Sequence, residues 1–221
     1  SGGSPGASGR AAGIRLVGTT GVTVSANTIT SAPFGVHMEP DALSVTVAPS
    51  NTLDGDSILY LHGASNVTLS GYTLAAQSNP TNFGKIAVFQ SSGITVQGNT
   101  VSGFTGAVGC SGDSSFGAKG CAGQDATGIL LQVCTSCTAT GNTVSGIVGG
   151  KGGMGGWSKG TSGGTGGVAA GIRLVSSAAF SLVDNRVSGV VGGAGGTTGE
   201  YAGGGNGGDG LAVLVSGGSG T

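Results

Sequence analysis

The heptapeptide Ala11-Ala12-Gly13-Ile14-Arg15-Leu16-Val17 occurs a second time, without change, at residues 169–175. Between and beyond these copies the chain carries further short apolar strands of the same kind. Their first apolar residues are Ile14, Val36, Ile58, Ile86, Ile129, Ile172 and Leu211, at steps of 22, 22, 28, 43, 43 and 39 residues. Because chance does not explain an identity of seven residues at this distance, the sequence predicts a chain built from internal repeats.

Each repeat continues with a turn and a second strand, such as Val22-Thr23-Val24, and then a third strand introduced by asparagine, such as Asn27-Thr28-Ile29. Period-2 alternation directs Ile14 and Leu16 inward and Arg15 outward. The asparagine suits the bend before the third strand, and its amide can hydrogen-bond along a stack of equivalent residues. A three-stranded unit this short cannot bury its apolar face alone, so we expect the repeats to stack.

These strands and turns resemble the right-handed parallel β-helix family, the pectate-lyase-like solenoids. The resemblance implies an all-β fold of about six and a half coils, in which residues 1–221 form a single solenoid domain. The seven apolar residues named first would then form one inward-facing stack. Lyases, hydrolases, epimerases, tail spikes, adhesins and passive surface proteins share this fold, so the resemblance implies no single function.

Glycine is concentrated in four segments, residues 1–12, 103–127, 146–168 and 189–209, although the chain has 51 glycines in all. The last three segments follow the third strand of successive repeats, so we expect them to leave one side of the solenoid as arms. Two forms remain open. The arms could be flexible glycine loops. Alternatively, they could pack together as extended left-handed helices, similar to the polyglycine II layers of some phage adhesins and antifreeze proteins; their similar starts favour this form.

The N-terminal segment reads as the end of a further arm, because residues 10–12 lead into Gly13 much as residues 168–170 lead into Gly171. At the other end, Leu211–Val215 supplies a first strand and a turn, and we expect no second strand after it. Neither end shows a capping helix, and open coil ends invite pairing with another edge. We therefore expect axial stacking, either of copies of this chain or within a longer chain. The alternative is a monomer whose ends are covered by arms folded back over them.

The four cysteines fall into two local pairs, Cys110 with Cys121 and Cys134 with Cys137. An even count in a glycine-rich chain predicts two disulfides between these nearest partners, and with them an extracellular or cell-surface location. Free thiols and metal binding remain as alternatives. The Cys134–Cys137 spacing lacks the strand-to-helix context of a redox motif, and the four spacings match no zinc ribbon.

Acidic residues are the natural candidates for a carbohydrate-active site, and Glu39, Asp41, Asp54 and Asp56 cluster in the second repeat. Asp54 and Asp56 are weak calcium candidates, the alternative being a polar turn before the next strand. A glycosidase needs two carboxylates that face each other across a sugar. The paired aspartates, Gly-His-Gly and Arg-Ile-Lys that the resemblance would imply for a hydrolase do not occur in this sequence.

Basic residues provide no clearer catalytic site. We expect Arg15 and Arg173 to point outward from equivalent strands, with Lys85 opening another strand and His37 and His62 pointing outward as ordinary strand residues. No set of these residues converges in the sequence pattern. We therefore assign no catalytic residue and expect no cofactor.

Two further surfaces are candidates for binding. Phe116, Trp157 and Tyr201 lie in the arms, where each would either anchor its arm against the body or contact a ligand. A row of outward threonines is expected on the second strands: Thr23, Thr46, Thr68, Thr95 and Thr138. Threonine ladders bind ice in other solenoids, although threonine also simply suits an exposed strand position.

Composition excludes several classes of function. Charged residues make up 8% of the chain and its net charge is −1, so it lacks the basic patch of a nucleic-acid-binding protein. No run of 18 apolar residues is present to span a membrane. We interpret the chain as a non-catalytic extracellular structural or adhesive solenoid of a bacterial surface layer, appendage or filament. The alternative is a polysaccharide lyase, hydrolase or carbohydrate-binding module on the same scaffold, with surface polysaccharide as its partner.

Overall fold

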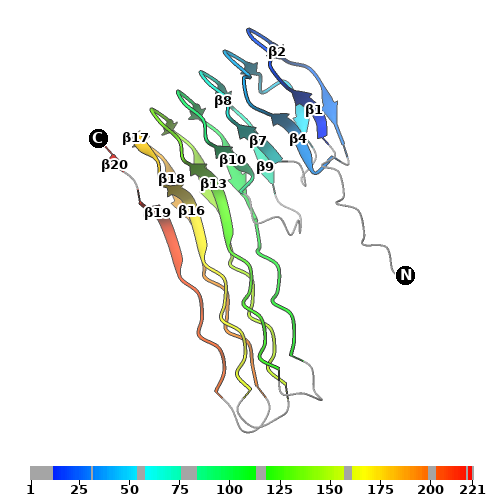
Figure 1. Ribbon diagram of the computed structural model, residues 1–221, viewed down its shortest axis with the longest axis vertical. Helices are drawn as coiled ribbons and strands as arrows, with labels where there is room; N and C mark the ends of the chain where they lie inside the picture. Colours follow the sequence, from blue (N-terminus) through cyan, green and yellow to red (C-terminus); the bar gives the residue numbers. More distant parts are fainter. Residues whose placement is uncertain are drawn as a thin grey trace.

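The computed structural model describes residues 12–30, 32–53, 58–75, 84–112, 118–156, 161–198, 203–217 and 219–220. Within this part of the chain all regular structure is β-strand, and every strand pair is parallel. The strands wind around one axis in coils of three, and three arms leave the same side of this body, next to each other (Figure 1). The predicted all-β solenoid is therefore confirmed.

The first strand of every coil belongs to one seven-stranded sheet. Its strands, in spatial order, are β1 (Ala12–Leu16), β4 (Phe34–Met38), β7 (Ile58–His62), β10 (Ile86–Phe89), β13 (Ala126–Gln132), β16 (Ala169–Val175) and β19 (Gly210–Ser216). Because each strand pairs with its equivalents one coil before and one coil after, the sheet runs the length of the solenoid.

The second strands form another seven-stranded sheet, made of β2 (Thr23–Val24), β5 (Thr46–Val47), β8 (Thr68–Ser70), β11 (Thr95–Gln97), β14 (Thr138–Thr140), β17 (Ala178–Val183) and β20 (Ser219–Gly220). The third strands form a pair, β3 (Thr28–Ile29) with β6 (Thr52–Leu53), and a four-stranded sheet of β9 (Thr73–Ala75), β12 (Thr100–Ser102), β15 (Thr143–Ser145) and β18 (Arg186–Ser188). The presence of β20 corrects one expectation, because a second strand does follow β19 and pairs with β17.

The core is a stack of apolar side chains inside the coils, and its main row differs from the predicted row at two places. The observed row is Ile14, Val36, Leu59, Ile86, Ile129, Ile172 and Val213. Ile58 is displaced because the register shifts between Phe34 and Val36, so that Leu59 pairs with Val36. Leu211 is displaced because it pairs with Ala170, which leaves Val213 opposite Ile172.

A ladder of asparagine amides lies beside this core, at the bend before the third strands. The side-chain oxygen of Asn142 accepts hydrogen bonds from the backbone and side-chain N–H groups of Asn99, both at 3.0 Å. The side-chain oxygen of Asn185 likewise accepts from the backbone N–H of Asn142 at 3.1 Å and from its side-chain N–H at 2.8 Å. In the third coil Tyr72 takes the place of the asparagine, and its backbone N–H donates to Asn99. Burial raises the pKa of Tyr72 against the opposite effect of its hydrogen bond with Asn51, so the hydroxyl is in the neutral form.

Each arm consists of an outgoing limb and a returning limb. The outgoing limbs are residues 104–112, 147–156 and 190–198, and the returning limbs are residues 118–125, 161–168 and 203–209. None of these residues is in a regular strand, yet the limbs exchange backbone hydrogen bonds at every third residue. The outgoing limbs form one layer and the returning limbs a second layer against it, and together they make a two-layer plate.

The limbs repeat every three residues, and the three positions differ in their surroundings and hydrogen bonds, as Lys151-Gly152-Gly153 illustrates. The outer residue, Lys151, is exposed. The N–H of the first glycine, Gly152, donates to Ala194 in the next outgoing limb at 2.9 Å. The N–H of the second glycine, Gly153, donates to Cys121 in the other layer at 2.8 Å. This periodicity and bonding are those expected for polyglycine II packing, the second of the two forms that the sequence left open.

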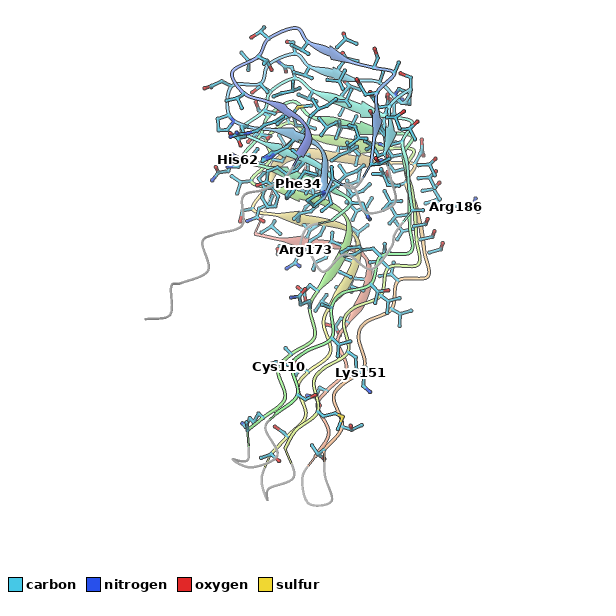
Figure 2. All side chains as sticks on the ribbon, turned by 90° about the vertical axis from the view of Figure 1, so that its right-hand side faces the viewer. Phe34, His62, Cys110, Lys151, Arg173 and Arg186 are labelled. Atoms are coloured by element: carbon cyan, nitrogen blue, oxygen red, sulfur yellow. A yellow bond between two sulfur atoms is a disulfide. The ribbon has the colours of Figure 1, made fainter. Side chains whose placement is uncertain are left out.

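Glycine is required at the two inner positions because the limbs touch along their backbones. A Cβ atom on Gly152 would overlap the carbonyl of Gly164 in the other layer, and one on Gly153 would overlap the carbonyl of Cys110 in the preceding arm. The plate therefore has almost no side chains inside it, in contrast to the body (Figure 2).

Among its described residues, the first arm departs from this rule only at its second positions, which include Ala107, Cys110, Cys121 and Gln124. In the later arms, a Cβ added at a second position would point at the preceding arm. On Gly150, for example, it would overlap the carbonyl of Ala107. No arm precedes the first one among the described residues, so side chains are tolerated there. The predicted Cys110–Cys121 disulfide is present and links the two limbs along this side; Cys134–Cys137, also as predicted, closes the turn between β13 and β14.

The asparagine ladder leads to a first prediction. Asn142→Ala should lower the free energy of unfolding by about 3 kcal/mol, because each buried polar group left unpaired costs roughly 1–3 kcal/mol. The variant would strip partners from Asn99 and from the carbonyl of Val96, which accepts from the Asn142 amide at 2.9 Å. Urea unfolding followed by circular dichroism would measure the change. Asn27→Ala, at the partly exposed start of the ladder, is the control; equal losses in both variants would contradict the prediction.

A second prediction concerns the arms. Gly153→Ala should loosen the plate, because its Cβ would displace the carbonyl of Cys110, whereas Met154→Ala shortens an exposed side chain and should leave the plate unchanged. Hydrogen–deuterium exchange of the arm amides should quicken by roughly tenfold or more in the first variant only. Similar exchange in both variants would show that the plate does not depend on backbone contact.

Candidate functional site

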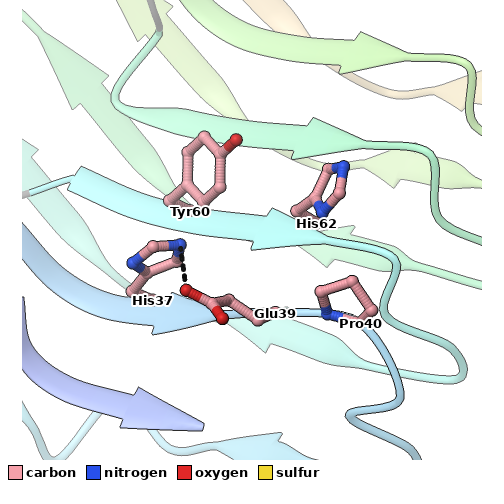
Figure 3. Close-up of a pocket in the computed structure, with 5 residues that line it drawn as sticks. All are labelled: His37, Glu39, Pro40, Tyr60 and His62. Carbon is pink, nitrogen blue, oxygen red and sulfur yellow. Dashed lines mark ion pairs between the residues drawn. The ribbon is translucent and has the colours of Figure 1, made fainter. Parts of the chain in front are cut away.

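The strongest candidate site lies on the outer face of the first sheet, over β1, β4 and β7. The register places Arg15, His37 and Tyr60 in one outward row across these strands. Glu39 directly follows β4, and His62 ends β7. A shallow cavity of about 370 Å³ lies here, lined by His37, Glu39, Pro40, Tyr60 and His62 (Figure 3).

Glu39 is the centre of the polar contacts around the cavity. Arg15 holds its carboxylate with two hydrogen bonds of 2.9 and 2.7 Å. His37 lies behind this pair, with its Nε2 atom 3.8 Å from Glu39 Oε1. On the far side, His62 Nε2 lies 2.9 Å from the side-chain oxygen of Gln90. The cavity therefore brings together one carboxylate, two imidazoles and a guanidinium from three coils.

Aromatic rings form the floor beside these polar groups. Tyr60 makes edge contacts with His37 and Phe34, with ring centroids 4.8 and 5.4 Å apart, and a tilted contact with Phe89 at 5.2 Å. His37 and Tyr60 are 4% and 7% exposed although they project from the outer face of the sheet. This packing fixes the imidazole and phenol in place, so the site is preorganised rather than loosely arranged.

The electrostatics restrict what Glu39 can do. Hydrogen bonding from Arg15 lowers the pKa of the Glu39 carboxyl, and the same contact raises the pKa of Arg15. Glu39 is therefore ionised at neutral pH and suits a hydrogen-bond acceptor or a base rather than a general acid. It is also the only carboxylate among the residues that line the cavity, whereas a glycosidase needs two. Within the described residues, no group of three His, Cys, Asp or Glu is placed to hold a metal.

A second ion pair lies where the first arm joins the body. Arg173 Nη1 donates to Asp125 Oδ2 at 2.9 Å, and the other oxygen of Asp125 accepts from the backbone N–H of Val168 at 2.9 Å. Arg173 occupies the same outward row as Arg15, as predicted. Since Asp125 is the last residue of a returning limb, this contact ties the first arm to the next coil and has a structural role.

Several residues singled out in the sequence cannot be compared with the structure. Asp54, Asp56, Phe116, Trp157 and Tyr201 all lie outside the described residues, so calcium binding and ligand contact at these positions stay predictions.

Other candidates lie in described parts of the chain. Lys85, which directly precedes β10, is 1% exposed, so it is buried where the sequence suggested an ordinary strand start. His37 points outward as expected but is covered, and His62 is half-buried. Asp41 is exposed and does not line the cavity.

The convergence of Arg15, His37, Glu39, Tyr60 and His62 is what the sequence analysis missed. It aligned Ile58 with Val36, which would have turned Tyr60 inward and Leu61 outward. The observed shift of one residue reverses both, because neighbouring residues of a strand face opposite sides. The signal that was available is the histidine and tyrosine in β7, which an inward alignment would have buried in the core.

The threonine row is a second surface feature, and the structure confirms its register. Thr23, Thr46, Thr68, Thr95 and Thr138 pair in succession along the second sheet, and Ser181 continues the row. This register is compatible with both interpretations of the row, an ice-binding ladder and threonines that simply suit exposed strand positions.

No helix among the described residues is long and apolar enough to cross a membrane. No curated protein sequence matches the chain. Among solved structures, the surface protein and adhesin PfbA of Streptococcus pneumoniae shares 11% identity at a TM-score of 0.20, and the match covers 96% of this chain and 64% of PfbA. HetL, a pentapeptide repeat protein involved in heterocyst differentiation regulation from Nostoc sp. strain PCC 7120, shares 11% identity at a TM-score of 0.16. The match covers 79% of this chain and 85% of HetL.

These structural scores are too low to transfer a function. The sequence profile of the right-handed β-helix region, in contrast, matches residues 12–199, the range over which the parallel coils stack in register. The chain therefore belongs to the right-handed β-helix family.

Proposed function

We propose that this chain is a non-catalytic extracellular β-solenoid that serves as a structural or adhesive element of a bacterial surface layer, appendage or filament. The observation that carries the proposal is the plate of six limbs, whose main chains hydrogen-bond directly to one another. Nine residues of such a limb extend about 28 Å, at roughly 3.1 Å per residue. The plate is thus a stiff spacer that holds its far end at a set distance from the body.

The disulfides support an extracellular location. Cys110–Cys121 lies on exposed residues of the first arm, where a reducing cytosol would keep the thiols apart. Outside the cell, a bond at this place fastens the two layers of the plate on the side where the described residues place no further arm.

The sequence between the limbs supports an adhesive role. Each outgoing limb is separated from its returning limb by a short interval, and each interval contains one aromatic residue: Phe116, Trp157 and Tyr201. Because three equivalent arms end side by side, we infer that the three aromatic residues act together on one ligand surface. Stacking on aromatic rings is a common way to bind the apolar faces of sugars, so surface polysaccharide is the proposed ligand.

The alternative, a polysaccharide-active enzyme or a carbohydrate-binding module, is favoured by one observation. The cavity at Glu39 combines a fixed carboxylate and two histidines with an aromatic floor. Such a cavity could bind the hydroxyl groups of a short saccharide. The adhesive proposal remains the main one, because the cavity supplies one carboxylate and that carboxylate is held by Arg15.

The adhesive proposal predicts that a triple variant, Phe116→Ala, Trp157→Ala and Tyr201→Ala, loses binding to polysaccharide by roughly tenfold or more, since aromatic contacts contribute about 1 kcal/mol each. Co-sedimentation with insoluble cellulose, chitin and bacterial cell-wall polysaccharide would measure this. In the unmodified protein, emission from Trp157, the single tryptophan, should shift on binding.

The matched control is Val108→Ala, Met154→Ala and Val191→Ala, which trims three exposed apolar residues of the outgoing limbs away from the intervals. Equal binding by both triple variants would contradict the adhesive role of the arm ends.

The alternative makes its own prediction. Glu39→Gln should weaken binding of soluble oligosaccharides at pH 7, while Asp41→Asn, on a nearby exposed residue, should not. Because Arg15 lowers the pKa of Glu39, the unmodified protein should keep its affinity at pH values above that lowered pKa and lose it as the pH falls through it. Calorimetric titration over a pH series would test both statements. An unmodified protein that binds no oligosaccharide at any pH would eliminate the alternative.

A further inference from the structure

Beyond the root of each outgoing limb, where Val148 donates to Phe104 and Val191 to Ile147, the hydrogen bonds within each layer of the plate run in one direction. Gly109 N–H donates to the carbonyl of Lys151 at 2.8 Å, and Gly152 N–H donates to the carbonyl of Ala194 at 2.9 Å. The returning limbs follow the same rule, as in the bond from Gly123 to Thr165 at 2.8 Å. Within a layer, each limb beyond its root therefore donates to the limb of the arm that follows it, and the two sides of the plate are chemically different.

The side formed by the third arm presents donors. The N–H groups of Gly192, Gly195, Gly204 and Gly207 occupy the positions that donate to a following arm elsewhere in the plate, and they have no acceptor among the described residues. We call these four residues the amide edge. They carry no side chains, so a further limb could approach their backbone as closely as the arms approach one another.

The opposite side is closed by side chains. The second-position residues of the first arm, Ala107, Cys110, Cys121 and Gln124, stand where the later arms have glycine so that they can touch a preceding arm. A limb placed against this side would meet the disulfide and a glutamine. The plate can therefore be extended at the amide edge and not at the first arm.

The sequence before β1 has the pattern of a limb made to follow another arm. Aligned through residues 10–13 and 168–171, Gly6 and Gly9 correspond to Gly164 and Gly167. At these two positions a Cβ atom would overlap carbonyls of the preceding arm, those of Cys121 and Gln124. Residues 1–11 lie outside the described residues, but Gly6 and Gly9 match the second-position glycines of the second and third arms, where the first arm has Cys121 and Gln124. Pro5 and Ser8 match Gly163 and Gly166, whose Cβ atoms would meet carbonyls of the following arm.

We infer that the amide edge binds residues 2–10 of a second copy of this chain, head to tail. The same alignment matches Ser4 and Ala7 to Ser162 and Thr165, whose carbonyls accept from the preceding returning limb. Gly204 and Gly207 would thus donate to Ser4 and Ala7 of the second copy.

This contact would place β1 of the second copy beside β19, where the edge residues Val213 and Val215 are 43% and 47% exposed. A head-to-tail contact of this kind does not close on itself, so it generates a filament. The inference rests on the proposed structural role and names the partner for it.

The test removes the donors without removing the backbone. Proline has no N–H, and its fixed φ suits an extended left-handed limb. A Cβ on Gly207 would lie 3.5 Å from the Gly193 carbonyl, an ordinary contact, and one on Gly204 would lie 3.3 Å from the Gly196 carbonyl, which would have to shift by a few tenths of an ångström. The variant is Gly204→Pro with Gly207→Pro. Its matched control, Gly204→Ala with Gly207→Ala, adds the same Cβ atoms and keeps both donors.

Sedimentation velocity over a series of micromolar concentrations would give the readout. The unmodified chain and the alanine control should form species several times heavier than 20.7 kDa, and the proline variant should sediment as the monomer. Gly6→Val with Gly9→Val, which alters the other half of the contact, should also be monomeric. A mixture of the proline and valine variants should form a heterodimer of twice the monomer mass and nothing larger, because each retains one intact half.

An unmodified chain that stays monomeric, or a proline variant that associates like the alanine control, would overturn the inference. So would two monomeric variants that fail to combine, since that result would indicate a symmetric contact. Exchange protection of the arm amides in each variant checks that the plate is intact. Polysaccharide binding by the monomeric proline variant would show that the adhesive role holds independently of the filament.

Discussion

Every part of this structure depends on the backbone hydrogen bonds that join each coil to the equivalent residues of the next. They keep the inward row from Ile14 to Val213 in one line, which is why short strands can share a core that none could enclose alone. They also bring one asparagine amide onto the next, as in Asn99 and Asn142. The body is thus determined by repetition of a single register rather than by many separate tertiary contacts.

The arms inherit this register from the strands that they connect. Since each limb starts one coil above the last, limbs of neighbouring arms lie side by side along their length, and glycine at two of every three positions allows them to touch. The same rule explains the exception. Where no arm precedes among the described residues, as at Ala107 and Gln124, the chain has side chains again, and the Cys110–Cys121 disulfide links the two limbs on this side.

The sequence was sufficient to predict the solenoid and both disulfides, because the repeats and the cysteine spacings can be read directly from it. For the arms it left two forms open and favoured the packed one. It was not sufficient for the cavity at Glu39. That site depends on one extra residue between Phe34 and Val36, which no periodicity reveals and which turns Tyr60 toward His37. The buried state of Lys85 likewise depends on its packing environment, and its place at the start of a strand does not indicate it. Local irregularities, where function is often found, are what a repeat pattern cannot predict.

The outer positions of the limbs accept side chains, unlike most of the inner positions, which require glycine. Their side chains, such as those of Val108, Lys151 and Met154, point to solvent and take no part in holding the plate together. Along one limb they recur at about 9.3 Å, three residues at roughly 3.1 Å each. Selection can therefore rewrite the chemistry of a whole flat face, residue by residue, at little cost in folding. The outer residues of the plate can thus evolve to recognise a ligand without changing the residues that stabilise it.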